Sequence, residues 1–202
     1  MGRGRGRAAG YDDQREAILA HAAHLFARRG YASTSMNQVA QACGLSKPTL
    51  YHYYRDKYAL LVSIAEGHVA RLEALVHARM AEAGAPEARL RALVSSLMAE
   101  YAGAQDAHRV LTEDVKFLEP DDRARVLARE RWIVARFADV IVQVRPDLSQ
   151  AALAKPLTMF LFGMVNWMFT WMRPDGALDY EALSPVVADL FIGGLAAVRP
   201  PG

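Results

Sequence analysis

The chain contains 202 residues, of which 52% are hydrophobic and 23% charged, so it is long enough to bury a substantial core in one or two domains. Its net charge is only +2, but residues 1–57 hold nine Lys or Arg residues against four acidic residues, which leaves +5 there and −3 over the remainder. Only the N-terminal part is therefore suited to attract a polyanion. The single cysteine, Cys43, excludes an intrachain disulfide and fits the reducing cytoplasm.

Helical periodicity dominates the sequence, and no stretch shows the sustained alternation of a strand, so we predict an all-α fold of nine helices. Residues 1–11 are expected to form a flexible arm rich in Gly and Arg. Asp12 or Asp13 then caps the first helix, which Gly30 ends. The other expected helices begin at Thr34 or Ser35 (ending at Cys43) and at Ser46, and then span about 56–81, 86–102, 107–117, 120–144, 149–172 and 180–198.

Residues 156–172 carry no charge and are the one segment that resembles a membrane span. The segment falls just short of the ~18–20 residues that a span needs, and three polar residues interrupt it. A helix that is apolar all round is more often buried in protein, which is the interpretation we favour. Residues 1–10 lack the apolar core of a secretory signal, so we expect a cytoplasmic protein.

The spacing of three residues predicts a helix-turn-helix that reads DNA. Ala40 is small where two helices must approach closely, and Gly44 can adopt the positive φ of a tight turn. Leu50, six residues later, is the apolar plug of the second helix. The outward side chains of that helix are Lys, Thr, His and Tyr, which suit a phosphate-lined groove better than an enzyme cleft.

The N-terminal 58 residues hold a dense pattern of characteristic positions, which are Ile18, Leu19, Ala22, Leu25, Phe26, Gly30, Tyr31, Thr34, Ser35, Met36, Val39, Ala40, Gly44 to Lys47, Thr49 to Tyr54 and Lys57. In this pattern the chain resembles the TetR family of bacterial transcriptional regulators. The resemblance implies an all-α homodimer with two domains, a DNA-binding domain at 1–57 and an effector-binding and dimerisation domain at 58–202. Each subunit would place its third helix in a major groove of a palindromic operator.

The expected DNA contacts lie mainly on the third helix. Lys47 is the best candidate to reach guanine O6 and N7, and Pro48 is placed to touch a thymine methyl group. Residues with hydroxyl or imidazole groups at phosphate height set the register; they are Ser46, Thr49, Tyr51, His52 and Tyr53. Thr34, Ser35 and Lys57 are expected to meet phosphates at the amino ends of the second and fourth helices.

Two alternatives stay open for these residues. The tyrosines can simply pack the small domain, and for Tyr54 we favour packing because it shares the side of Leu50. Arg3, Arg5 and Arg7 alternate with glycine, as in a basic arm that enters the minor groove, but a disordered solubilising tail has the same composition. We favour a nonspecific contribution to phosphate binding over both of these interpretations.

The segment 159–172 is rich in Met and aromatic residues and predicts a ligand pocket or an interface. A helical projection places Phe160, Met164, Trp167 and Trp171 on one face, and Met159, Phe162, Gly163, Asn166 and Thr170 on another. A helix apolar on both faces needs two partners: its own core, and either a second subunit or a ligand. Asn166, if buried, must be hydrogen-bonded to a ligand or to the neighbouring chain.

The runs Leu161 to Gly176 and Ala188 to Leu195 resemble the branch of the TetR family that senses acyl-coenzyme A thioesters, phenylacetate-pathway regulators in particular. This resemblance implies an apolar or aromatic acyl group lodged among helices, with arginines that bind the nucleotide phosphates. The candidate ligand-binding residues are Tyr101, Arg109, Phe117, Arg131, Trp132, Phe160, Met164, Asn166, Trp167, Thr170, Trp171 and Arg173.

An enzyme is excluded because the sequence offers no nucleophile with a base and no Gly-rich phosphate loop. His21 and His24 lack further ligands at metal-binding spacing, so we expect no metal and no cofactor. The predicted function is a dimeric repressor that an acyl-coenzyme A thioester, such as phenylacetyl-coenzyme A, releases from its operator. The alternatives are a DNA-binding regulator without a small-molecule effector, and one that senses a different hydrophobic ligand.

Overall fold

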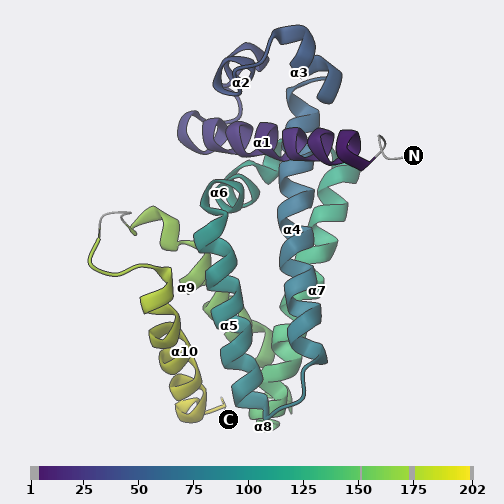
Figure 1. Ribbon diagram of the computed structural model, residues 1–202. Coiled ribbons are helices and arrows are strands. Elements are labelled where there is room, and N and C mark those ends of the chain that lie inside the picture. The colour runs from purple at the N-terminus through teal and green to yellow at the C-terminus, as the bar shows by residue number, and fades with distance from the viewer. Residues whose placement is uncertain (1–4, 151, 173–175, 201–202) are drawn as a thin grey trace. The chain divides into compact units, whose positions relative to one another are not determined.

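The computed structural model describes residues 5–150, 152–172 and 176–200, with side chains from Gly10 onward. Every regular element in these ranges is a helix, which confirms the all-α prediction (Figure 1). These ranges contain ten α-helices rather than the nine predicted. In chain order they are α1 (Arg5–Arg29), α2 (Met36–Ala42), α3 (Lys47–Tyr53), α4 (Lys57–Ala81), α5 (Pro86–Gly103), α6 (Gln105–Asp114), α7 (Pro120–Val144), α8 (Asp147–Gln150), α9 (Ala154–Asn166) and α10 (Tyr180–Ala197), with 3-10 helices η1 (Val115–Phe117) and η2 (Met168–Thr170).

The chain divides into two compact units. The first unit consists of residues 1–68 and 106–124, and the second of residues 69–105 and 125–202. The division does not follow a single cut in the sequence, because α6 and η1 belong with the N-terminal helices. Helices α4 and α7 each contribute residues to both units.

The core of the first unit is built on the apolar stripe of α1. Ile18, Ala22 and Phe26 recur at helical spacing and are almost completely buried, as are Val39 of α2 and Leu50 of α3. Gly30 ends α1 with a φ of +84°, a left-handed conformation that glycine adopts without steric cost. These residues hold helices α1, α2 and α3 around one apolar centre.

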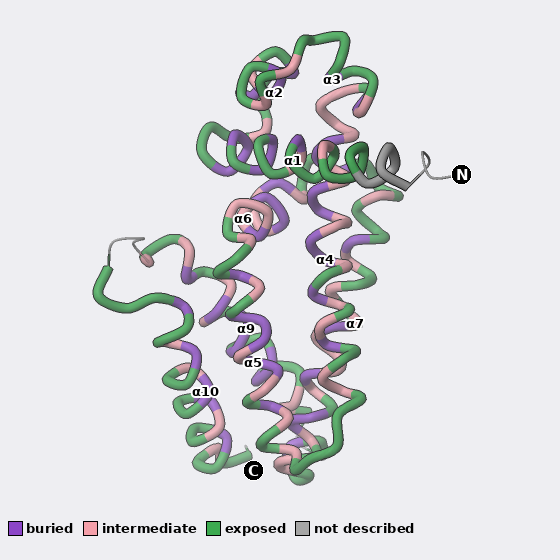
Figure 2. The backbone as a smooth tube through the Cα atoms, viewed as in Figure 1, coloured by how far each residue is buried: buried purple, intermediate pink, exposed green. Residues whose placement is uncertain are grey.

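The core of the second unit lies among α5, α7, α9 and α10. Helix α10 packs along α5, where the Ser184 hydroxyl donates to Ser95 Oγ at 3.0 Å. The rings of Phe137 on α7 and Phe162 on α9 meet edge to face at 5.1 Å. Buried and exposed residues alternate along α10 (Figure 2), so one side of this helix faces the core and the other faces outward.

The prediction of a single helix at 149–172 is wrong, because the segment is broken into α8, α9 and η2. Ala152 has a φ of +53°, and α9 begins only at Ala154. Pro156 gives the reason: it has no N–H to donate and is tolerated only in the first turn of a helix. A helix that continued from Ser149 through Pro156 would place the proline in the interior.

The flexible arm predicted at 1–11 is also corrected, because α1 begins at Arg5. Ala8 and Ala9 favour helix, and this local preference extends the helix ahead of the predicted cap at Asp12 or Asp13. Arg3 lies outside the described residues. Arg5 and Arg7 lie in the first turns of α1, and their side chains are outside the description.

One helix, α10, has the length and mean hydropathy (1.3) of a membrane span, but this single match is weak support for a span. The segment 156–172, which resembled a span in the sequence, is not one continuous helix. Within the described residues, no group of three or more His, Cys, Asp or Glu side chains is placed to hold a metal ion. His24 instead lies 2.9 Å from Asp106 Oδ2.

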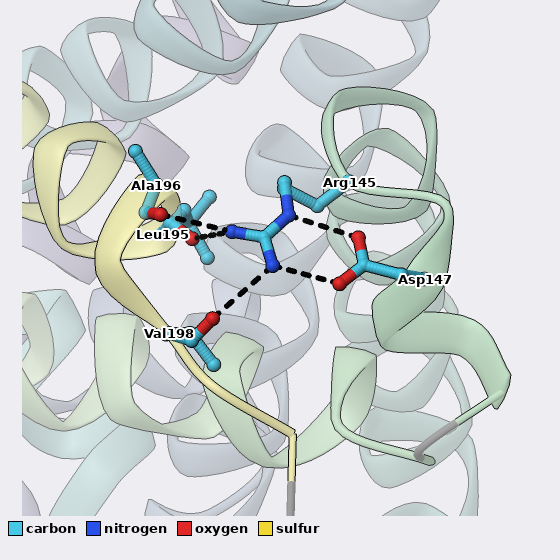
Figure 3. A network of polar contacts seen from close by, with 5 residues as sticks. All are labelled: Arg145, Asp147, Leu195, Ala196 and Val198. Atoms are coloured by element: carbon cyan, nitrogen blue, oxygen red, sulfur yellow. Dashed lines mark hydrogen bonds and ion pairs between the residues drawn. The ribbon is translucent and has the colours of Figure 1, made fainter.

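Arg145, between α7 and α8, holds the C-terminal end of α10 (Figure 3). Its guanidinium donates to both carboxylate oxygens of Asp147, at 2.9 and 2.7 Å, and to the carbonyl oxygens of Leu195, Ala196 and Val198. Those carbonyls are among the groups that a helix C-terminus leaves without internal partners. The arginine therefore fixes α10 through charge-assisted hydrogen bonds, and it keeps the pKa of Asp147 below its usual range.

We expect Arg145→Gln to lower the melting temperature by a few degrees, because the shorter neutral amide cannot span Asp147 and three carbonyl oxygens. Arg91→Gln, which removes a single ion pair between α5 and α10, is the matched control and should lower the melting temperature less than Arg145→Gln does. Asp147 is more acidic in the folded state, so its stabilising effect is present above its unfolded pKa and is lost as the pH falls through its folded pKa. Thermal melts from pH 7 to pH 3 should show the gap in melting temperature between the wild type and Arg145→Gln becoming smaller at the acidic end, while the part due to the carbonyl contacts remains. A gap that does not change with pH would contradict this role of Asp147.

Candidate DNA-binding surface and effector domain

The turn between α2 and α3 has the geometry of a helix-turn-helix, as the spacing predicts. Gly44 has a φ of +64°, and the Leu45 amide donates to the Ala40 carbonyl oxygen at 2.9 Å. Ala40 is buried, so the two helices meet closely at this point. Leu50 has no exposed surface and anchors α3 from within, which confirms its role as the apolar plug.

Helix α2 begins with a capping box. The Ser35 hydroxyl accepts from the Gln38 amide at 3.3 Å, and the Gln38 side chain accepts from the Ser35 amide at 2.8 Å. Ser35 is exposed at the amino end of α2. Thr34, by contrast, is only 2% exposed, and its hydroxyl donates to the Gly30 carbonyl oxygen at 2.9 Å. The predicted phosphate contact by the Thr34 side chain is corrected, because this hydroxyl is used inside the domain.

Helix α3 begins with a cap from Ser46, whose hydroxyl accepts from the Thr49 amide at 3.3 Å. Pro48 stands in the first turn, where its missing N–H has no cost. The helix turns Leu50 inward and most of its polar side chains outward. The exposed residues are Lys47, Pro48, Thr49, Tyr51 and His52, while Tyr53 is half-buried.

Lys57, predicted to meet a phosphate, is engaged within the domain. Its ammonium group donates to the carbonyl oxygens of Tyr31 and Ala32, at 2.8 and 3.2 Å, and lies 4.4 Å from the centre of the Tyr31 ring. These contacts tie the start of α4 to the turn between α1 and α2. The sequence pattern did not signal this because the contact joins segments 25 and 26 residues apart.

Sequence reasoning missed the contribution of α1 to this surface. The ring of Tyr11 stacks on that of Tyr53, with centroids 4.8 Å apart, and Arg15 Nε donates to the Tyr54 hydroxyl at 3.4 Å. Tyr54 is buried, as expected for a packing residue. The one sequence feature that could have indicated this contribution is the helix preference of Ala8 and Ala9. It extends α1 toward the N-terminus, so that Tyr11 lies within the helix.

In the second unit, two predicted ligand-binding residues are brought together. Tyr101 is almost completely buried, and its hydroxyl donates to Asn166 Oδ1 at 2.9 Å. Burial raises the pKa of Tyr101, so the phenol stays neutral and remains a donor. The expectation that Asn166 is hydrogen-bonded is met, but this partner belongs to the same chain rather than to a ligand or a neighbouring subunit.

The predicted aromatic face of α9 and η2 points outward. Phe160, Trp167 and Trp171 are 66%, 50% and 60% exposed, while Phe162 is buried. Phe162 therefore belongs to the core and not with Met159, which is exposed, so the projected second face is corrected. Met164 is half-buried, Gly163 is exposed, and the exposed Thr170 donates to the Trp167 carbonyl oxygen.

The remaining ligand candidates are dispersed. Arg109 pairs with Glu113 at 3.0 Å, and Phe117 contacts the Tyr31 ring; both lie in the first unit. In the second unit, Arg131 is exposed, and Trp132 stacks on His77 with centroids 4.0 Å apart. Arg173 lies outside the described residues.

Two family models match the chain, one in its N-terminal part and one in its C-terminal part. Residues 18–64 match the model of the bacterial regulatory proteins of the tetR family, and residues 83–195 match the tetracyclin repressor-like C-terminal domain. A TetR-family regulator from Bordetella parapertussis is 34% identical, with a TM-score of 0.84 over 93% of this chain and 98% of that one.

Two further proteins are similar along most of the chain. AibR, solved with isovaleryl coenzyme A and operator DNA, is 29% identical, with a TM-score of 0.73 over 94% of this chain and all of that one. The transcriptional activator FasR of Mycolicibacterium smegmatis is 25% identical over 98% of this chain and 90% of its own length.

Other relatives share only the DNA-binding end. The regulator YerO of Bacillus subtilis is 34% identical over 58 residues, which are 29% of this chain and 20% of that protein. The helix-turn-helix geometry, the two matched family models and these relatives lead to one conclusion. The chain belongs to the TetR family of DNA-binding transcriptional regulators, and it is not an enzyme.

Proposed function

We propose that the protein is a cytoplasmic homodimeric repressor, which binds a palindromic operator through α3 and leaves it when an acyl-coenzyme A thioester binds the second unit. The observation that carries the DNA-binding half is the outward face of α3, where Lys47, Tyr51 and His52 are exposed while Leu50 is fully buried. The similarity to AibR, which binds isovaleryl coenzyme A and operator DNA, supports the effector half.

The base contacts are assigned to the amino end of α3. Lys47 reaches guanine, and Pro48 touches a thymine methyl group. Phosphate contacts come from exposed or half-buried groups, and Lys57 contributes positive charge from its position against the turn between α1 and α2. The phosphate set is Ser35, Ser46, Thr49, Tyr51, His52 and Tyr53, with Arg3, Arg5 and Arg7 as a basic extension.

Lys47→Ala should weaken binding to the operator about 10- to 100-fold, because a bidentate contact to guanine is lost. The matched control is Lys116→Ala, which removes an exposed lysine of η1 in the same unit and should have little effect. The operator is obtained by selection from random duplexes with the wild-type protein, and affinity is measured by fluorescence anisotropy at fixed salt. Equal losses in both variants would assign the effect to net charge rather than to α3.

Dimerisation is assigned to the exposed apolar residues of α9 and α10. Phe160 and Trp167 of the α9 region and Val186 and Leu190 of α10 are each at least half exposed, and the two helices pack against each other within the second unit. A monomer rarely leaves so many large apolar side chains in water. Two such helix pairs would bury one another in a symmetric, self-complementary interface.

Leu190→Glu combined with Phe160→Glu should convert the dimer to a monomer, because four charges would be buried at the symmetric interface. Light scattering after gel filtration measures the mass, and circular dichroism verifies the helical content. Ala99→Glu, at an exposed position of α5, is the control that should stay dimeric. A dimer that survives the double substitution would place the interface elsewhere.

The thioester site is assigned to the polar pair within the second unit. Tyr101 donates to Asn166 Oδ1 and so orients the amide, whose nitrogen is then the donor for the carbonyl oxygen of a thioester. The buried apolar neighbours of the pair, such as Leu97 and Met98, suit an acyl chain. Arg131, Trp132 and Arg173 remain candidates for the nucleotide portion.

A panel of acyl-coenzyme A thioesters, with phenylacetyl- and isovaleryl-coenzyme A included, should contain one member that releases the operator while its free acid does not. Asn166→Leu should then raise the thioester concentration needed for release at least ~10-fold and leave operator affinity unchanged. Tyr101→Phe is the milder companion, since it keeps the ring and removes the hydroxyl that orients the amide. An operator complex indifferent to every thioester would favour a regulator without a small-molecule effector, or one with a different hydrophobic ligand.

A further inference from the structure

The outer side chains at the carboxyl end of α3 contact a third ring, which comes from α1. Tyr11 stacks on Tyr53 at 4.8 Å with an interplanar angle of 26°, and its ring meets His52 edge-on at 6.3 Å. His52 and Tyr53 meet each other at 5.6 Å. The three rings form a closed cluster on the unit that binds DNA.

This cluster continues the packing stripe of α1. Tyr11, Arg15, Ile18 and Ala22 are spaced by four, three and four residues, so they lie along one face of the helix. Ile18 and Ala22 are buried in the core, Arg15 donates to Tyr54, and Tyr11 stacks on Tyr53. Tyr11 and Arg15, one turn apart on α1, therefore contact Tyr53 and Tyr54, which follow one another at the end of α3.

The position of Tyr11 is itself fixed by the helix. Since α1 begins at Arg5, Tyr11 lies more than a turn inside it, and a helical backbone restricts the directions of the side chain. Helix α3 has only seven residues, and its cap and buried anchor act through Ser46 and Leu50. Neither the cap nor the anchor restricts the rotamers of His52 and Tyr53. The ring contacts with Tyr11 do restrict them.

We propose that Tyr11 is a positioning residue for operator recognition, which holds His52 and Tyr53 in the conformation that meets the DNA. The inference rests on the proposed DNA contacts of α3 and adds to them a residue from α1. Long side chains that are mobile before binding lose rotamer freedom when they bind, and ordering them in advance removes that cost. Tyr11 restricts the rotamers of these two side chains through the contacts of its ring and not through its hydroxyl.

Tyr11→Ala should weaken binding to the selected operator about tenfold, with a smaller change on a random duplex, because nonspecific binding depends on charge rather than on ring orientation. Tyr11→Phe keeps the stack and should bind like the wild type. Phe117→Ala is the matched control, since Phe117 is an exposed ring of the same unit with a similar exposed fraction, 41% against 37% for Tyr11. Thermal melts verify that all three variants fold.

A double-mutant cycle separates positioning from direct contact. In a background that carries both His52→Ala and Tyr53→Ala, Tyr11→Ala should cost little further affinity, because the two rings that it positions are gone. Additive losses, or a Tyr11→Phe protein as weak as Tyr11→Ala, would show that Tyr11 meets the DNA itself and would overturn the proposal. Unchanged operator affinity for Tyr11→Ala would also overturn it, whereas a wild-type protein that selects no operator sequence would contradict the proposed function instead.

Discussion

The burial of one side of α3 is the constraint on which the DNA-binding surface depends. A helix of seven residues is too short to be stable by itself in water, so its structure must come from packing and capping. Leu50 and Tyr54 fill the interior, and Ser46 satisfies the Thr49 amide at the start. Because the apolar side of the helix faces inward, Tyr51 and His52 are exposed to solvent, and Tyr53 is half-buried against Tyr11. The recognition face is therefore a consequence of the core beneath it.

The same unit also includes a segment from the middle of the chain. The Tyr58 hydroxyl at the start of α4 donates to Asp122 and accepts from the Glu119 amide, and burial together with Asp122 raises the pKa of Tyr58 to about 12. Further along α4, His68 Nε2 lies 3.3 Å from His108 Nδ1 of α6. These contacts bind residues 106–124 to the DNA-binding helices. The backbones of α4 and α7 continue from this unit into the second one, and the chain also passes between the units at residues 105–106. Under the proposed function, α4 and α7 are the natural levers of a ligand response.

Much of the first unit could be predicted from the sequence because its determinants are local. The turn at Gly44, the plug at Leu50 and the caps at Ser35 and Ser46 each follow from spacing within a few residues. Thr34 and Lys57 could not be assigned in the same way, since their partners are set by tertiary packing. Tyr11 was missed for a related reason: only the path of α1 in the fold brings it to Tyr53.

The second unit was harder to predict because both faces of α9 are apolar. Periodicity identifies the faces of a helix but not the one that meets its own core, and Phe160 and Phe162 are equally hydrophobic although only Phe162 is buried. The break before α9 depends on where Pro156 falls within a turn, and a search for apolar periodicity does not weigh that position. One polar residue of the segment, Asn166, was recognised from its contrast with its apolar neighbours, but its partner Tyr101 lies 65 residues away.

Under the proposed function, the position of Asn166 links the two tasks of the second unit. It is the last residue of α9, and Trp167, the next residue, leaves the helical conformation and is half exposed. The hydrogen bond from Tyr101 thus holds the end of α9 at the point where the chain turns from this partly buried polar pair to the outward aromatic face. A thioester whose carbonyl oxygen accepts from the Asn166 amide nitrogen would act on both sides of this point. Ligand binding and subunit association would then share one helix terminus, and a coupling of ~1–3 kcal/mol there is enough to change operator occupancy substantially.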